Sequence, residues 1–119
     1  MSPEHLFIQS HTHNGRIGVL VEFGLEFSIT AKCNAFSRLS KDLAMHIAAS
    51  NPENLVALLE QPFVKNTFIT VAQWLSEASA ELKDNIIITR FVRWVHEPVK
   101  AGPPPDDQPA VAVRMKLVR

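Results

Sequence analysis

Residues Gly15 to Pro52 read GRIGVLVEFGLEFSITAKCNAFSRLSKDLAMHIAASNP, and the spacing of their apolar side chains changes partway along. The first part has a period of two, which is typical of a strand that buries one face. The residues expected on that buried face are Ile17, Val19, Val21 and Phe23. The second part, Asn34 to Ala49, has the helical period, and its apolar stripe comprises Phe36, Leu39, Leu43 and Ile47. The segment therefore predicts a strand, a loop and then a helix.

Another strand is expected immediately upstream. Leu6 to His11 reads LFIQSH, and the pair Asn14-Gly15 separates it from the strand that begins at Ile17. Asparagine and glycine both accept a positive φ, so this pair suits a type I′ turn between adjacent strands. The two strands are therefore expected to form an antiparallel hairpin.

Two more helices are expected downstream. The pair Asn51-Pro52 should end the first helix, because the residue before a proline avoids the helical region. The segment Pro52 to Leu59 could form a short second helix. Thr70 and Gln73 match a capping box, in which each side chain bonds the backbone N–H of the other residue. A third helix should therefore begin directly after Thr70.

The last predicted strand, Ile86 to Val95, is apolar on both faces. Simple alternation places Ile86, Ile88, Val92 and Trp94 on one face, and Ile87, Phe91 and Val95 on the other. A strand with two apolar faces is typically covered on both sides. Helices can cover one face, and a second copy of the chain is the simplest cover for the other. We therefore expect an α+β fold, with a three-stranded antiparallel sheet, helices packed on one face, and a homodimer through the sheet.

The composition of the chain changes near residue 99. Residues 1–98 are predicted to form one domain, and residues 99–119 a proline-rich linker and a tail. The linker, Lys100 to Ala110, reads KAGPPPDDQPA, and its prolines favour an extended chain. Apolar residues alternate again over residues 111–118, which permits an extra strand at a sheet edge. A disordered tail is the alternative for this segment.

Composition and charge narrow the class of protein. The 119 residues include 12 basic and 12 acidic ones, so the net charge is zero and bulk positive charge cannot drive nucleic-acid binding. Cys33 is the one cysteine, which favours a reducing compartment. The N-terminus lacks the pattern of a signal peptide, and no apolar run approaches the roughly 20 residues of a membrane span. We expect a cytoplasmic protein that does not bind membranes.

Several short motifs carry a resemblance to a known family. They are GRIGVLVE from Gly15, LAMHIAA from Leu43, QPFVK from Gln61, the pair Asn85-Ile86, and RFVR from Arg90. These motifs, in this order, resemble the core of bacterial elongation factor Ts, which strips GDP from elongation factor Tu. The resemblance covers most of the chain. It implies the α+β fold of the dimerisation domain of that family, elongation factor Tu as the partner, and pairing of two copies through the core.

The resemblance also implies which loop acts on the partner. In the family this loop follows the strand that ends here at Glu22-Phe23, and its Thr-Asp-Phe-Val motif reaches the magnesium and nucleotide site of elongation factor Tu. Magnesium neutralises the phosphates, so disturbing the groups that position it weakens nucleotide binding. The present chain has serine for the aspartate and isoleucine for the phenylalanine of that motif. The implied partner-binding residues are Leu25, Glu26, Phe27, Ser28, Ile29 and Thr30, with His46 in support.

These substitutions leave two hypotheses for function. In the first, the chain binds elongation factor Tu and promotes GDP release weakly. In the second, it is a protein-interaction module with the same fold and no exchange activity. A slip of the loop by two residues could present Glu26 and Phe27 as a substitute acidic and aromatic pair. The resemblance implies an N-terminal helical module and a helical insertion before the QPFVK motif, and the printed residues show neither pattern, so we expect them to correspond to a minimal core of the family.

The remaining candidate residues point to no chemistry. His11 and His13 should share one side of a strand, but they have no further ligand nearby in sequence, so we expect polar residues beside a turn and no metal. Cys33 lacks a positioned histidine and is expected to be an inert thiol. His46 could contact the partner, or it could be a packed histidine with a hydrogen bond. No catalytic motif is present, so we expect neither an enzyme nor a cofactor.

Overall fold

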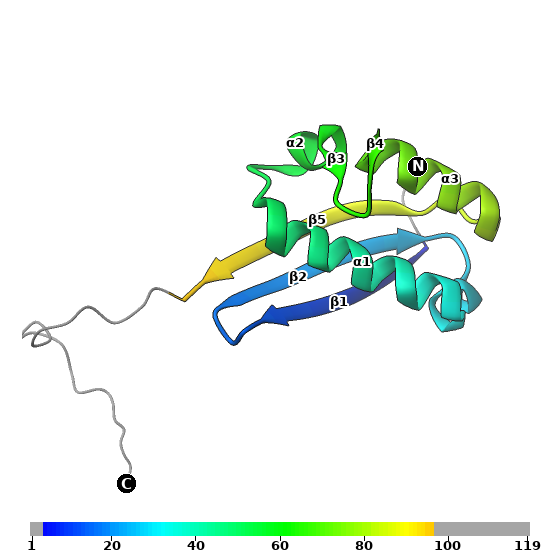
Figure 1. The fold of residues 1–119 in the computed structure, drawn as a ribbon. Coiled ribbons are helices and arrows are strands. Elements are labelled where there is room, and N and C mark those ends of the chain that lie inside the picture. The colour runs from blue at the N-terminus through cyan, green and yellow to red at the C-terminus, as the bar shows by residue number, and fades with distance from the viewer. Residues whose placement is uncertain (1–3, 97–119) are drawn as a thin grey trace, which may run out of the picture.

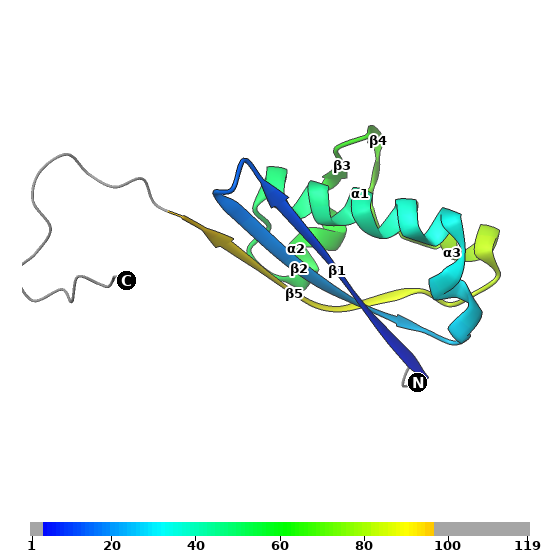
Figure 2. The same cartoon turned by 90° about the horizontal axis from the view of Figure 1, so that it is seen from below.

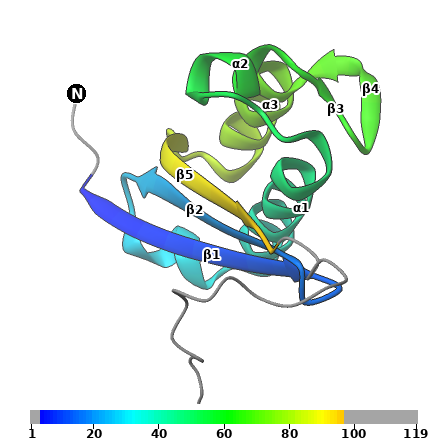
Figure 3. The same cartoon turned by 90° about the vertical axis from the view of Figure 1, so that its left-hand side faces the viewer.

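Three antiparallel strands and a layer of helices make up the protein in the computed structural model, which describes residues 4–96 (Figure 1). The elements in chain order are β1 (His5–His13), β2 (Ile17–Leu25), η1 (Ser28–Lys32), α1 (Asn34–Ser50), α2 (Leu55–Glu60), β3 (Pro62–Phe63), β4 (Asn66–Thr70), α3 (Val71–Leu82) and β5 (Ile87–Val95). The main sheet has the order β1-β2-β5, and α1, α2 and α3 lie on one side of it (Figure 3). The predicted α+β architecture is confirmed.

The hairpin of β1 and β2 forms as its sequence predicts. The strands pair from His5 with Leu25 to His13 with Ile17, so both are longer than the alternation alone indicated. Asn14 and Gly15 adopt φ values of 54° and 67°, and the N–H of Arg16 donates to the carbonyl of His13 at 3.0 Å. Positive φ at both central positions twists the turn in the same sense as the strands. Figure 2 shows the resulting twist, with β1 crossing β2 and β5 at an angle.

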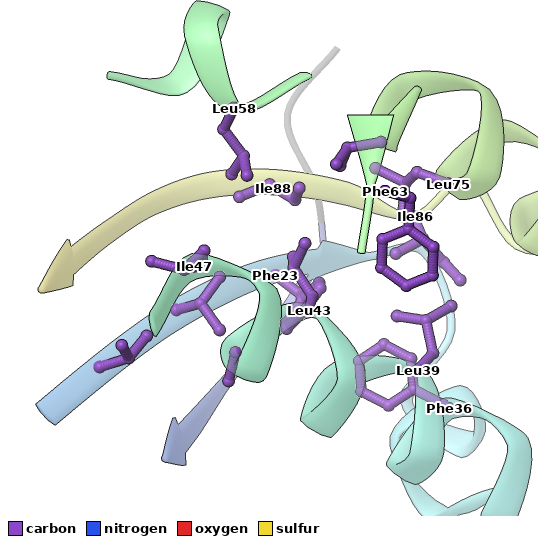
Figure 4. Packing of buried hydrophobic residues seen from close by; sticks show 14 of the residues in the cluster. Phe23, Phe36, Leu39, Leu43, Ile47, Leu58, Phe63, Leu75, Ile86 and Ile88 are labelled. Carbon is purple, nitrogen blue, oxygen red and sulfur yellow. The ribbon is translucent and has the colours of Figure 1, made fainter. Parts of the chain in front are cut away.

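Helix α1 buries the stripe predicted for it. Phe36, Leu39, Leu43 and Ile47 are all buried, and the helix packs over β1 and β2 (Figure 4). The Phe36 ring meets Phe7 and Phe23 edge to face, with ring centroids 5.1 Å and 5.4 Å apart. This geometry is the one that aromatic pairs prefer. The core therefore joins the first hairpin to the first helix, as the sequence from residue 15 to 52 indicated.

The segment between α1 and β5 contains the two predicted helices and a small hairpin that the sequence did not reveal. Helix α2 begins at Leu55, and the side chain of Asn54 caps it by accepting from the N–H of Ala57 at 2.8 Å. The capping box of α3 is confirmed, because Thr70 and Gln73 bond each other's backbone N–H groups. Strands β3 and β4 form the extra hairpin, and β3 is only two residues long. A strand this short leaves no readable period.

The faces predicted for β5 are wrong beyond Thr89. Phe23 pairs with Ile88 but Glu22 pairs with Arg90, so Thr89 is an extra residue and forms a bulge. The bulge reverses the alternation of side chains. Ile86 and Ile88 face the helices as expected, whereas Phe91 packs against the core and Val92 and Trp94 face the opposite side. Beyond the bulge, simple alternation therefore assigns these residues to the wrong faces.

The sheet face that carries no helix among residues 4–96 is partly apolar, and we call it the open sheet face. Its exposed apolar residues are Leu6, Ile8, Leu20, Val92 and Trp94. Glu22 and Arg90 lie between them and form an ion pair, with Arg90 Nε 3.1 Å from Glu22 Oε1. A hollow of about 360 Å³ lies beside this pair, lined in part by Ile8, Leu20 and Val92. The second apolar face expected from the sequence therefore exists, although its residues on β5 differ from those predicted.

Two predicted features belong to the C-terminal part of the chain. The linker and the possible strand at residues 111–118 lie outside the described residues. Among residues 4–96, no helix is long and apolar enough to cross a membrane.

Candidate partner-binding site

The loop after β2 presents three consecutive side chains to solvent. Leu25 ends the strand with its side chain fully buried, and Glu26 is half-buried. Phe27 is 53% exposed, Ser28 is exposed, and Ile29 is 73% exposed. Thr30 then turns inward and is buried. The surface of the loop therefore consists of a hydroxyl between two apolar groups, which can bind an apolar pocket on another protein.

A short 3₁₀ helix gives the loop its shape. The element η1 spans Ser28–Lys32, and Phe27 precedes it in an extended conformation. The N–H of Thr30 donates to the carbonyl of Phe27 at 3.2 Å, and the N–H of Cys33 donates to the carbonyl of Thr30 at 3.1 Å. Two successive tight turns therefore connect β2 to α1. The sequence indicated a loop here but not this helical turn.

Asp84 anchors the loop from the turn between α3 and β5. Its Oδ1 accepts from the N–H of Glu26 at 2.9 Å. Its Oδ2 accepts from the N–H of Phe27 at 3.1 Å and from the Thr30 hydroxyl at 2.6 Å. Asp84 is only 3% exposed, so these bonds form largely away from water. The carboxylate therefore has matched donors on both of its oxygens, which a buried charge requires.

The hydrogen bonds also set the protonation state of Asp84. Burial raises the pKa of its carboxyl, but the hydroxyl of Thr30 and the N–H groups of Glu26 and Phe27 together lower this pKa by more. The positive charge of His5 contributes in the same direction. The net effect is a pKa below the usual 3.8, so Asp84 is ionised at neutral pH.

The turn that holds Asp84 is itself well ordered by hydrogen bonds. Lys83 ends α3 in the left-handed conformation, with a φ of 56°. The N–H of Asp84 donates to the carbonyl of Ser79 at 3.1 Å, and its carbonyl accepts from the N–H of Ile86 at 3.0 Å. Sequence reasoning missed Asp84. Its contacts lie 54 to 58 positions away, and no local pattern connects a lone aspartate in a turn to that loop.

His46 lies in α1 with its ring fully buried. The N–H of Val64 donates to His46 Nδ1 at 3.2 Å, so the ring is neutral and its Nε2–H donates to Gln61 Oε1 at 2.9 Å. Burial lowers the pKa of His46, and the bond to Gln61 offsets this only in part. The ring stacks on Phe63, which stacks in turn on Trp74. Of the two alternatives for this residue, the structure displays the packed histidine.

The implied site residues are therefore not all brought together. Glu26 to Thr30 form one loop that Asp84 anchors, and its exposed residues are Phe27, Ser28 and Ile29. His46 lies twelve residues into α1 from Asn34. At the helical rise this separation is about 18 Å along the axis. Its hydrogen bonds position the segment from Gln61 to Val64, so any effect on a partner would act through that segment.

The other residues considered from the sequence form no site among residues 4–96. The rings of His11 and His13 stack with centroids 6.2 Å apart. Cys33 is a half-buried free thiol. Within residues 4–96, no three histidine, cysteine, aspartate or glutamate side chains gather closely enough to hold a metal ion.

Comparisons with known proteins point to one family. A family model described as "Elongation factor TS" matches residues 1–57. Elongation factor Ts of Carboxydothermus hydrogenoformans is 31% identical over 92% of this chain and 72% of that protein. Elongation factor Ts of Alkaliphilus metalliredigens is 32% identical over 73% of this chain, which spans 61% of that relative's length. Elongation factor Ts of Trichlorobacter lovleyi is 41% identical over 68% of this chain and 26% of that protein.

Proposed function

The chain belongs to the elongation factor Ts family, and from that premise we propose that it binds elongation factor Tu and weakly promotes the release of GDP. The binding surface lies on the loop from Leu25 to Thr30 and consists of its exposed residues Phe27, Ser28 and Ile29. We further propose that it acts in the cytoplasm, where translation elongation takes place. The observation that carries the proposal is the exposed pair Phe27 and Ile29, held on a loop anchored by Asp84.

The chemistry of the loop supports contact with a partner. Exposed Phe27 and Ile29 offer apolar area that gains free energy when it is removed from water. Because η1 and the hydrogen bonds to Asp84 already order the backbone, little conformational entropy remains to be lost on binding. The loop can therefore bind through this surface without a change in its backbone conformation.

The same loop explains why exchange would be weak. The side chain of Ser28 is neutral, so it cannot exert the charged interaction that an aspartate would exert near a bound magnesium ion. The carboxylate nearest to it in sequence, Glu26, is half-buried and has its backbone N–H bound to Asp84. The Glu26 and Phe27 pair remains the alternative acidic and aromatic contact. Variants of Ser28 and Ile29, compared with variants of Glu26 and Phe27, distinguish which of the two pairs contacts the partner.

A binding assay with matched variants tests this surface. Ile29→Ala should weaken the affinity for GDP-bound elongation factor Tu about tenfold, as loss of a central apolar anchor does. Val56→Ala is the control, because Val56 is a similarly exposed aliphatic residue that lies on α2, away from the loop. Titration calorimetry measures both dissociation constants. Equal affinities for the two variants would refute binding through the loop, and undetectable binding by the natural chain would refute the partner.

We also propose that two copies pair through the open sheet face. Its exposed apolar residues flank the Glu22 and Arg90 ion pair on adjacent strands, and a shallow hollow lies beside this pair. Exposed apolar residues grouped around a polar pair are typical of a surface that associates. In such a dimer both loops would remain free, because Phe27 and Ile29 lie beyond the end of β2.

A further inference from the structure

We infer that Asp84 is the positioning residue of the loop from Leu25 to Thr30, holding Phe27 and Ile29 in the orientation that meets the partner. The inference deepens the function proposed above and rests on it for the partner alone. The geometric part concerns only this chain and can be tested without any other protein.

The position of the three donors around Asp84 is the main support. Two of them are the N–H of Glu26, which lies directly before the exposed residues, and the N–H of Phe27, which is the first of them. The third, the hydroxyl of Thr30, lies directly after them. The exposed segment of Phe27, Ser28 and Ile29 is therefore fixed at both ends by one carboxylate. A contact at only one end would leave the segment free to pivot.

The end of the sheet explains why the loop needs this carboxylate. Leu25 is the last residue of β2 that pairs with β1, and its carbonyl accepts from the N–H of Glu4 at 3.1 Å. Glu26 and Phe27 lie beyond that ladder, where no strand within residues 4–96 bonds their N–H groups. A backbone N–H without a partner is costly when it is shielded from water. Asp84 takes the place of a neighbouring strand for these two residues.

The carboxylate also joins the loop to a distant part of the fold. Asp84 is itself held by the carbonyl of Ser79 in the last turn of α3 and by the N–H of Ile86, which directly precedes β5. The loop is thus braced against both elements. Charge-assisted hydrogen bonds are stronger than neutral ones. Replacing the charged carboxylate of Asp84 should therefore weaken its bonds to the loop and loosen the loop, while the rest of the domain stays folded.

Amide hydrogen exchange tests the inference directly. The variant Asp84→Asn keeps the size of the side chain but turns one acceptor oxygen into a donor NH₂ group, which leaves at least one loop donor unmatched. The exchange rates of the Glu26 and Phe27 amides should rise about tenfold or more, relative to core amides in the same sample. Ser40→Ala is the matched control, since it removes the hydroxyl of another buried polar residue, whose contact with the half-buried Gln9 does not touch the loop.

The two outcomes of this experiment are distinct. A selective loss of protection at Glu26 and Phe27 in Asp84→Asn, and not in Ser40→Ala, is the expected result. Equal protection in the two variants would overturn the inference and leave Asp84 as a residue of the α3–β5 turn alone.

A second pair of variants covers the case in which Asp84→Asn does not fold. Thr30→Ser keeps the hydroxyl, and Thr30→Val removes it with little change in volume. Only Thr30→Val should raise the exchange rates of the Glu26 and Phe27 amides, by about threefold or more, because it removes a donor from the carboxylate that they share. Unchanged rates in Thr30→Val would also overturn the inference.

Binding to elongation factor Tu completes the test and separates two possible failures. Thr30→Val should weaken the affinity for elongation factor Tu several-fold, whereas Thr30→Ser should keep the affinity of the natural chain. If the loop loosens as expected but no variant or natural chain binds elongation factor Tu, the proposed function fails and the positioning role of Asp84 stands. If the natural chain binds and Thr30→Val loosens the loop without changing the affinity, the inference fails and the proposed function stands.

Discussion

Thr30 and Asp84 are 54 positions apart in the sequence, yet the Thr30 hydroxyl donates a 2.6 Å hydrogen bond to Asp84 Oδ2. This bond joins the loop after β2 to the turn before β5, across the end of the sheet. Because the same carboxylate accepts from Glu26 and Phe27, the exposed part of the loop is bound at both of its ends. The shape of the proposed partner-binding surface therefore depends on a residue outside the loop.

Acid should weaken the fold through Asp84. The pKa of Asp84 is lowered in the folded protein, so the unfolded chain binds this proton more tightly. The stability supplied by the ionised carboxylate is fully present above the unfolded-state pKa near 3.8, and it is lost as the pH falls through the lower folded-state pKa. Urea unfolding at several pH values measures this. Asp84→Asn should cost about 1–3 kcal/mol at pH 7, and the difference from the natural chain should shrink below pH 3.8. A constant difference down to the lowest pH would contradict the assignment.

Restoring the family's motif should strengthen exchange. The double variant Ser28→Asp with Ile29→Phe places a carboxylate and a ring on the exposed part of η1. GDP release from elongation factor Tu should then accelerate at least about tenfold over the natural chain, because a close charge contact is worth more than 1.4 kcal/mol. The control is Glu26→Gln with Phe27→Ala, which removes the alternative pair. Suppose that Glu26→Gln with Phe27→Ala abolishes the acceleration of GDP release, and that Ser28→Asp with Ile29→Phe does not increase it. The arrangement in which Glu26 and Phe27 contact the partner would then be the correct one.

His46 should make the stability depend on pH in a higher range. Burial lowers its pKa below 6.5 in the folded state, so the unfolded chain takes up the proton first as the pH falls. The contribution of neutral His46 is complete above pH 6.5 and declines as the pH drops from 6.5 through the folded-state pKa. His46→Gln remains neutral and should show a flatter dependence in urea unfolding between pH 7 and 5. A nuclear magnetic resonance titration in which the His46 ring charges at or above 6.5 would contradict this assignment.

Pairing through the open sheet face should be sensitive to charge at its centre. Leu20 lies on the middle strand, β2, so Leu20→Lys would bury a charge in the proposed dimer. Sedimentation velocity should show the natural chain as a dimer and Leu20→Lys as a monomer. Phe68→Lys is the control, because Phe68 is exposed on β4, outside the open sheet face. A monomeric natural chain at high concentration would rule out the pairing.

Sequence reasoning succeeded where the signal is local. The alternation from Ile17 to Phe23, the positive-φ pair Asn14-Gly15 and the capping box at Thr70 each depend on residues close in sequence, and each is confirmed. These features together define the first hairpin and the start of the third helix.

It failed where one segment must respond to another. The register between β5 and β2 shifts by one residue at Thr89, which leaves Thr89 as a bulge. The hydroxyl of Thr89 donates to Glu22 Oε1 at 2.7 Å. The alternation of residues within β5 does not predict that bond, because its partner lies on another strand. Asp84 is a similar case, since a lone aspartate in a turn becomes important only when the fold brings the loop beside it. The loop itself was located through the family resemblance, whereas its anchor could come only from the structure.

The most direct test of the proposed function is the rate at which fluorescent GDP leaves elongation factor Tu as this protein is added. We expect the release rate to rise with the concentration of the natural chain and to fall back when Ile29 is changed to alanine, with Val56→Ala as the unaffected control. A release rate that stays at its spontaneous value at saturating concentrations of the natural chain would contradict the exchange function.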